Sequence, residues 1–242
     1  MSLNKRLIRT NDTGGGGIVT CNDPFGDSSL KTLYQMNGNA NDSLNNDDGS
    51  PVGVSWVSGL YNQAVRFDGI DDYINSVQRL NVGDTITGWI KPDFTAGANR
   101  FFRIYGSYDS QYDFSVMYLF YSNTTGEWKL QLRIRNEVGR YLYQDAVVNN
   151  VNTNDWNFFT ISFASYTQYE CSLNGVIYTP TTTASGSNPT SIAVGARYIG
   201  RHIINGATTY TDPCDIDQVR YFNRTLNQDE INILYTLDAP CG

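Results

Sequence analysis

Apolar and polar residues alternate along much of the chain with a period of two, which is the pattern of β-strands with one buried face. The clearest run covers residues 127–135, where every second side chain is apolar. We expect Trp128, Leu130, Leu132 and Ile134 to face a core. A strand of this kind keeps one wet face, so it must pack against a second layer.

About a dozen further segments have strand character and are separated by turns rich in Gly, Asn and Asp. Residues 114–121 are apolar on both faces, which places them in the middle of a sheet. Residues 179–189, rich in Thr, Ser and Pro, are expected to form a loop. The predicted strands are 30–36, 52–57, 64–67, 85–91, 100–105, 114–121, 127–135, 141–148, 156–163, 169–173, 176–178, 192–199 and 215–221.

This series of strands has no long helical pattern and no internal repeat, so it predicts an all-β, two-sheet antiparallel sandwich. One short helix is predicted after Asn227, a residue type that caps helix N-termini, with Glu230 completing a capping box. Ile231, Leu234 and Tyr235 share one apolar face of this helix. So short a helix is not stable alone, and we expect it to lie along one edge of the sandwich.

The last predicted strand contains Asp217, which simple alternation puts on the same inward face as Val219 and Tyr221. A buried carboxylate without a partner costs several kcal/mol. Three kinds of partner are open: backbone amides, a cation, or an arginine. The candidate arginines are Arg66, Arg220 and Arg224.

Composition supports a β-rich globular body. The chain has 242 residues, with 17 Tyr, 11 Phe and 22 Gly and only 17% charged residues. The formal net charge is −7, although Lys5, Arg6 and Arg9 give +3 to the first ten residues. An acidic body of this kind repels nucleic acid. No apolar run reaches the length of a membrane span, and the N-terminus lacks a secretion signal, so we expect synthesis in the cytoplasm.

The first 27 residues differ from the rest, because they have no periodicity and include the glycine run 14–17. They are either a disordered terminus or a basic tether that becomes ordered on a partner. We therefore divide the chain into an extended N-terminal arm with a Gly-rich hinge (1–27), a β-sandwich (28–238) and a short tail (239–242).

The four cysteines, Cys21, Cys171, Cys214 and Cys241, contain no CxxC pair, and His202 is the one histidine. A zinc site is therefore disfavoured. Cytoplasmic synthesis favours free thiols, although a late disulfide among Cys21, Cys214 and Cys241 remains open.

Several motifs occur in an order that resembles a laminin-G-like (LamG) domain of the concanavalin A-like jelly-roll type, over residues 28–237. The resemblance implies two antiparallel sheets, one convex and one concave, with the chain ends close together. LamG domains serve adhesion, glycan binding and architecture, so it does not specify a function. The motifs are LYQMNGNANDS (33–43), GLYNQAVRFDGIDDYI (59–74), TGWIKP (87–92), WNFF (156–159), LNGV (173–176), IGR (199–201) and DQVRYFNRTL (217–226).

The resemblance also implies a structural calcium ion. In the family, a similar calcium site is formed by an acidic residue near the first strand, a glycine carbonyl and the Asp of the last strand. By position, the resemblance implies Asp42, Gly59 and Asp217 as these ligands. Oxygen ligands of this kind suit calcium. A pairing of Asp217 with an arginine is the alternative.

Catalytic chemistry is not indicated. Glycosidases need two facing carboxylates about 5–10 Å apart, and the one acidic pair at strand spacing is Asp215 with Asp217. His202 has no Ser or Cys motif beside it. We therefore expect no catalytic residues and no enzymatic activity; the glycosidase alternative would depend on Asp215 and Asp217.

Tyrosines have the right chemistry to stack against sugars, but most are expected in the core or at strand edges, so the ligand-binding residues stay unassigned. Those concentrated in the middle of the sequence are Tyr105, Tyr108, Tyr112, Tyr118, Tyr121, Tyr141 and Tyr143.

A basic arm, a glycine run and one LamG body together resemble the layout of virion proteins of tailed bacteriophages. Our main hypothesis is a non-enzymatic virion structural protein, either a head decoration or a fibre or tail adhesion component. It would bind other capsid or tail proteins and sit in the virion, with a homo-oligomer left open. The alternative is an extracellular or cell-surface carbohydrate-binding module that recognises host or environmental polysaccharide.

Overall fold

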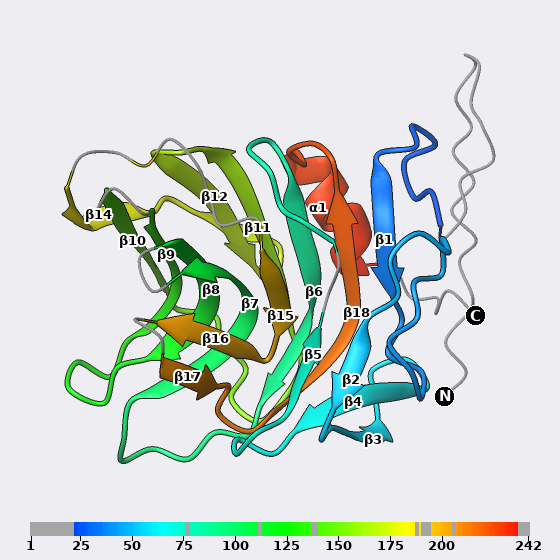
Figure 1. Ribbon diagram of the computed structural model, residues 1–242, viewed down its shortest axis with the longest axis horizontal. Coiled ribbons are helices and arrows are strands. Elements are labelled where there is room, and N and C mark those ends of the chain that lie inside the picture. The colour runs from blue at the N-terminus through cyan, green and yellow to red at the C-terminus, as the bar shows by residue number, and fades with distance from the viewer. Residues whose placement is uncertain are drawn as a thin grey trace.

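The computed structural model describes residues 22–75, 78–110, 113–136, 140–186, 189, 195–204 and 207–236. Within these residues, two eight-stranded antiparallel sheets face each other, and one short helix lies outside them (Figure 1). The predicted all-β jelly-roll sandwich is therefore confirmed. No helix among the described residues is long and apolar enough to cross a membrane.

The first sheet has the order β13-β12-β11-β6-β18-β4-β3, with β1 also paired to β18. Strand β18 lies between β6 on one side and β4 and β1 on the other, and it is buried along its whole length. The strands are β1 (Leu30–Tyr34), β3 (Ser55–Ser58), β4 (Gln63–Phe67), β6 (Thr85–Pro92), β11 (Asn157–Ser165), β12 (Gln168–Leu173), β13 (Val176–Tyr178) and β18 (Cys214–Phe222).

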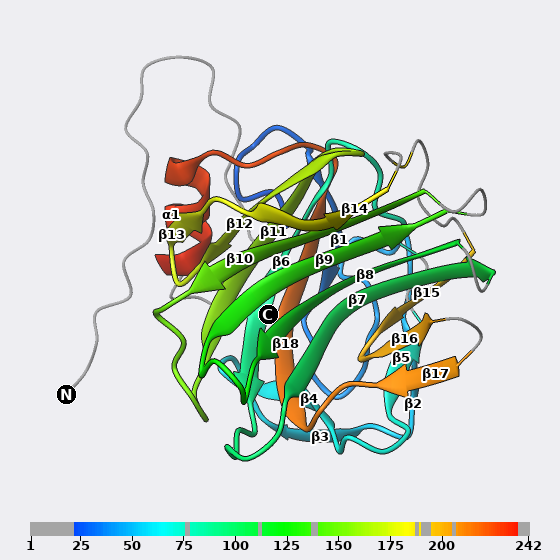
Figure 2. The same cartoon turned by 90° about the vertical axis from the view of Figure 1, so that its left-hand side faces the viewer.

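The second sheet has the order β14-β10-β9-β8-β7-β15-β5-β2. Figure 2 shows its strands β7 to β10 side by side across the face that is turned toward the viewer. The predicted central position of β8 is confirmed. The strands are β2 (Ser50–Val52), β5 (Tyr73–Asn75), β7 (Arg100–Ser110), β8 (Asp113–Tyr121), β9 (Trp128–Arg135), β10 (Tyr141–Val148), β14 (Thr181–Ser185) and β15 (Ala196–Ile199).

A separate hairpin of β16 (Arg201–Ile204) and β17 (Ala207–Tyr210) folds against β7. Gly106 of β7 makes this contact possible, because a Cβ there would lie 2.5 Å from the carbonyl oxygen of Arg201. The hairpin thus covers part of the outer face of the second sheet.

Two predicted elements are wrong. Residues 52–57 are not one strand, because the chain turns at Gly53 (φ +78) and passes from β2 in the second sheet to β3 in the first. The expected loop 179–189 contains β14, which pairs with β10. Its threonines favour extended backbone, and the open edge of β10 supplies the hydrogen-bonding partner.

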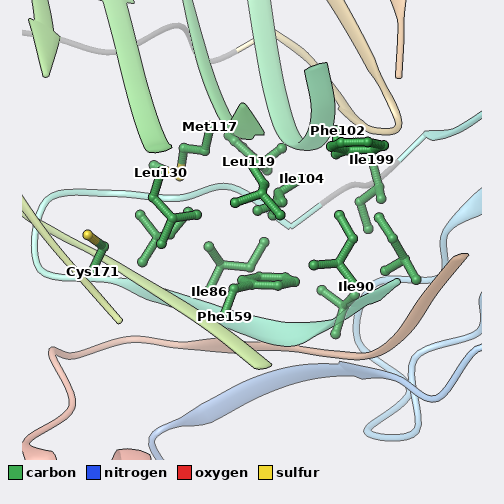
Figure 3. Packing of buried hydrophobic residues seen from close by; sticks show 14 of the residues in the cluster. Ile86, Ile90, Phe102, Ile104, Met117, Leu119, Leu130, Phe159, Cys171 and Ile199 are labelled. Carbon is green, nitrogen blue, oxygen red and sulfur yellow. The ribbon is translucent and has the colours of Figure 1, made fainter. Parts of the chain in front are cut away.

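The main core lies between the two sheets, where side chains of β7, β8 and β9 meet those of β6 and β11 (Figure 3). The predicted alternation of residues 127–135 is confirmed, since Leu130, Leu132 and Ile134 are buried in this core and Trp128 packs against it. Each fully buried apolar side chain stabilises the fold by roughly 1.5–3 kcal/mol.

Helix α1 (Gln228–Thr236) begins as the sequence predicts. The Glu230 amide donates to Asn227 Oδ1 (3.0 Å), and the Asn227 amide donates to Glu230 Oε2 (2.9 Å). The expected location at a sandwich edge is wrong, however, because Ile231 and Leu234 pack on the outer face of the first sheet. Their partners there are Trp89 of β6, Phe158 of β11 and Phe222 of β18.

The chain enters the sandwich beside this helix. Phe25 packs against Phe222, with 5.5 Å between ring centroids. Arg224 pairs with both Asp27 and Glu230, at 2.6 Å in each case. Most of the predicted arm (1–21) and the whole predicted tail (239–242) lie outside the described residues.

Cys171 and Cys214 are free and buried, and burial raises the pKa of each thiol to about 12. Both therefore stay protonated at neutral pH, as small apolar core residues do. Cys21 and Cys241 lie outside the described residues.

Candidate functional site

Asp217 lies in a part of β18 where an extra residue interrupts the pairing with β6. Asp217 faces Trp89, and Arg220 faces Thr87, so three steps along β18 match two along β6. Gln218 takes the strain of this bulge with a φ of 51°. Strand partners that lie opposite each other share a face, so Asp217 lies on the outer face with Trp89.

The prediction that Asp217 shares a face with Val219 and Tyr221 is therefore wrong. Val219 and Tyr221 belong to the core between the sheets. A single extra residue reverses the alternation, and it does so between Asp217 and these two side chains.

Asp217 is nevertheless completely buried, because the turn after β3 covers it. The Tyr61 amide donates to Oδ2 (3.1 Å), and a Cβ on Gly59 would lie 2.8 Å from that same oxygen. Oδ1 has no hydrogen-bonding partner. Burial raises the pKa of Asp217 to about 7, and the Tyr61 amide only partly offsets it.

The arginines considered for Asp217 have other partners. Arg66 pairs with Asp215 (3.1 Å) and Asp93, while Arg224 holds Asp27 and Glu230. The Arg220 guanidinium donates to the carbonyl and side-chain oxygens of Gln218, at 3.2 Å each. Of the three kinds of partner considered, backbone amides donate to Asp217, and the nearby positive charge of Arg220 also lowers its pKa, though less than burial raises it.

Unlike Asp217, Asp42 has both carboxylate oxygens hydrogen-bonded to backbone amides of its own loop and strand. Its Oδ1 accepts the amides of Leu33 (2.8 Å) and Leu44 (3.1 Å), and its Oδ2 accepts those of Asn46 (3.0 Å) and Asp47 (3.3 Å). These four bonds use the lone pairs that a carboxylate offers. Asp42 therefore organises its own loop, and as a calcium ligand it would have to release amides.

The three residues predicted to hold calcium thus fit the ion only in part. Gly59 and Asp217 lie together, and the unpartnered oxygen of Asp217 suits a cation, whereas Asp42 is already fully hydrogen-bonded. Calcium binding here stays a prediction.

A second acidic group comprises Asp68, Asp71 and Asp72, each with a carboxylate oxygen within 4.8 Å of the others. Sequence reasoning did not single it out as a site, although it lies within one of the LamG-like motifs. The Asp68 amide donates to Asp72 (2.8 Å), and the Ile70 amide donates to Asp68 (2.8 Å). These bonds shape the turn between β4 and β5.

The outer face of the second sheet holds a row of polar and aromatic side chains, which we call the β8–β10 face. Tyr118, Gln131 and Asp145 lie opposite one another across β8, β9 and β10. Arg133 faces Tyr143 in the neighbouring row, and its guanidinium contacts Asp145 at 2.7 Å. The face therefore joins two tyrosines, an amide and an ion pair.

Arg133 is the centre of this arrangement. Its guanidinium carbon lies 5.1 Å from the ring centroid of Tyr143 and 6.0 Å from that of Tyr118, within the range of cation–π attraction. Tyr141 extends the aromatic surface, with its ring centroid 5.4 Å from that of Tyr143. Burial raises the pKa of Tyr118, so its hydroxyl stays protonated and can donate.

Of the tyrosines that the sequence left unassigned, the structure brings Tyr118, Tyr141 and Tyr143 onto this face, while Tyr105 lies in the core. Tyr118 is itself buried on this face, at 9% exposed, whereas Tyr141 and Tyr143 are partly exposed. Alternation alone placed Lys129, Gln131 and Arg133 outward. It could not show which tyrosines of β8 and β10 would join them, since that depends on register between strands.

The acidic pair considered for hydrolysis is not open to a substrate. Asp215 is 4% exposed and bound to Arg66, and Asp217 is 0% exposed beneath the turn at Gly59. His202 is also buried, which lowers its pKa to about 3, with the nearby Arg103 adding to the effect.

Residues 68–232, more than half of the chain, match the Laminin_G_3 family model, described as the concanavalin A-like lectin/glucanases superfamily. The chain belongs to this family. The Laminin_G_3 sandwich is thus a lectin-like jelly-roll domain, and its resemblance to LamG domains is confirmed. No curated protein matches it in sequence.

Solved structures with a similar fold include a mutant of Trypanosoma rangeli sialidase displaying trans-sialidase activity, with 15% identity and a TM-score of 0.61 over 88% of this chain and 34% of that one. The botulinum neurotoxin serotype D binding domain has 18% identity and a TM-score of 0.57 over 86% of this chain and 51% of that one. The Laminin_G_3 chain thus spans a third to a half of these structures, and such low identity shows the fold alone.

Proposed function

We propose that this protein is a non-catalytic carbohydrate-binding module and that its ligand lies on the β8–β10 face. The observation that carries the proposal is the pair of partly exposed rings Tyr141 and Tyr143, next to Arg133 and its partner Asp145. Aromatic rings pack against the apolar faces of sugars, and amide, carboxylate and guanidinium groups bond to their hydroxyls.

The proposal of a non-enzymatic role rests on the acidic pair. Asp215 and Asp217 are sealed, one by Arg66 and the other by the turn at Gly59, so neither carboxyl can reach a glycosidic bond. The sialidase and neurotoxin structures support the fold and carry no further argument about activity.

Display on a virus particle is the second candidate. The observation that favours it is the attachment of Phe25 and Asp27 to Phe222 and Arg224, beside α1 on the outer face of the first sheet. Phe25 and Asp27 thus lie on the side opposite the β8–β10 face, and the proposal attaches the particle through the chain that precedes them. We infer capsid or tail proteins as partners and the virion as the location, with self-association and an extracellular or cell-surface module as alternatives.

Binding to a glycan array tests the carbohydrate proposal. We expect the wild-type chain to bind at least one glycan, and the double variant Tyr141→Ala, Tyr143→Ala to bind it about tenfold more weakly, since each lost aromatic contact costs about 0.5–1.5 kcal/mol. Tyr166→Ala is the matched control, because Tyr166 is an exposed tyrosine on the turn between β11 and β12. An array without a ligand, or equal binding by the double variant, would overturn the proposal.

A further inference from the structure

We infer that the ligand of the β8–β10 face is an acidic polysaccharide that carries uronic-acid carboxylates. The inference rests on the proposed function and adds the chemical class of the sugar. It is drawn from the sign of the charged side chains on this face, which is opposite to the net charge of the chain.

Positive charge gathers on this face although the whole chain has a net charge of −7. Among the described outward side chains of β7 to β10, the cationic ones outnumber the carboxylates. Asp145 and, just before β9, Glu127 are the acidic residues that pair with them. The cationic residues of the β8–β10 face are Lys129, Arg133 and Arg135, while Arg103 lies on the neighbouring β7 and donates to the carbonyl of Tyr210 in β17.

Two of these cations remain in reach of a ligand. The side chains of Lys129 and Arg133 are 21% and 17% exposed. The three hydrogen bonds of Arg133 within the described structure all leave from Nη1, toward Asp145 and the carbonyls of Leu132 and Gln144. A guanidinium has five N–H donors, so its other edge can receive a ligand carboxylate.

The geometry favours a carboxylate on a sugar over a nucleic-acid phosphate. Asp145 lies within the cationic patch, 2.7 Å from Arg133 and 4.0 Å from Lys129. A carboxylate there accepts hydrogen bonds from sugar hydroxyls, whereas a phosphodiester has no proton to donate and would be repelled. The planar guanidinium of Arg133 matches a carboxylate with two parallel bonds.

The stacked tyrosines hold Arg133 in place for this contact. Tyr118 and Tyr143 flank its guanidinium, and Asp145 fixes one edge. An arginine oriented in advance loses less side-chain freedom when it binds, so more of the interaction appears as affinity.

The test compares binding of the full chain to polygalacturonate, alginate, dextran sulfate, dextran and single-stranded DNA at low and high salt. We expect binding to polygalacturonate or alginate that weakens with salt, and at least tenfold weaker binding to dextran, to DNA and to dextran sulfate, which is acidic but carries no carboxylate. Lys129→Gln should weaken uronate binding about tenfold, because the variant loses the charge-assisted hydrogen bond from its ammonium group to the ligand carboxylate. Lys31→Gln removes the same charge from β1 of the first sheet and should change nothing.

The outcomes separate the two proposals. Binding to dextran or another neutral glycan that Tyr141→Ala, Tyr143→Ala removes, without preference for uronates, would overturn the inference and leave the proposed function standing. Preference for dextran sulfate or DNA, or equal effects of Lys129→Gln and Lys31→Gln, would also overturn the inference. Absence of binding to every glycan, on the array as in this panel, would overturn both.

Discussion

At the scale of single residues, Asp217 shows how one extra residue in a strand changes the environment of a side chain. The bulge at Gln218 turns it away from the core, and the turn at Gly59 then covers it. The result is a carboxyl with a raised pKa of about 7 and one oxygen without a partner. Above this pKa the ionised carboxyl of Asp217 lowers the free energy of unfolding, and a neutral side chain at the same position would not.

Replacing Asp217 by Asn should stabilise the protein at pH 8. The pKa of Asp217 rises on folding from 3.8 to about 7, so the protonated carboxyl is favoured in the folded state. Its contribution to the free energy of unfolding is fully present below pH 3.8 and is lost as pH rises through 7. We expect the stability advantage of Asp217→Asn to grow between pH 4 and pH 8 by roughly 2–4 kcal/mol. Urea denaturation at pH 4, 6 and 8 with a chelator present measures it.

The exposed Asp229→Asn serves as the control and should show no such trend. A variant that is less stable than wild type at pH 8 in chelator would contradict this account of Asp217. Repeating the series with calcium tests the predicted site, since occupancy at 100 times the dissociation constant would add about 2.7 kcal/mol to wild type. An equal free energy of unfolding with calcium and with chelator would contradict the predicted calcium site.

At the scale of elements, local signals predicted well and non-local ones did not. The alternation in β9 and the reciprocal Asn227–Glu230 cap of α1 depend on neighbours in sequence, and both are confirmed. Strand β14 exists because the edge of β10 is open to it. The bulge in β18 was missed because Gln218 is not a residue type that signals a positive φ.

The same limit applies to the candidate site. The outward position of Lys129 and Arg133 follows from β9 alone, but their proximity to Tyr118, Tyr143 and Asp145 depends on register across three strands. Sequence alone therefore identified the chemistry of the tyrosines without placing any of them on a face.

Removing the cap of α1 tests how far the helix depends on it. Asn227→Ala deletes the acceptor for the Glu230 amide and should lower the free energy of unfolding by about 1 kcal/mol. Asn232→Ala, within the helix, is the control for loss of an exposed asparagine. Chemical denaturation measures both, and an equal effect of the two variants would show that the cap does not hold the helix.

At the scale of the whole molecule, the two outer faces differ. The first sheet is covered by α1 and by the chain at Phe25, while the β8–β10 face lies on the second sheet. Under the proposals above, attachment and ligand binding would therefore be separated by the thickness of the sandwich.

Deleting residues 1–17 should leave the melting temperature within about 1 °C of wild type, because the sequence predicts that they form an arm outside the sandwich, and changes outside a packed body alter stability by at most about 0.5 kcal/mol. Under the virion proposal, the same deletion should abolish incorporation into particles, because the arm is the tether. Quantitative mass spectrometry of purified particles measures incorporation. Normal incorporation of the truncated chain would contradict the tether.

The position at which the chain enters the sandwich has a practical consequence. A fusion partner joined ahead of Asn22 would start beside Phe25 and Arg224, with both layers of strands between it and Tyr143. The domain can therefore be immobilised on a bead or a sensor chip through that end while its tyrosines face the solution. Coupling through surface lysines would not keep this orientation, because one of these lysines, Lys129, lies on the β8–β10 face itself.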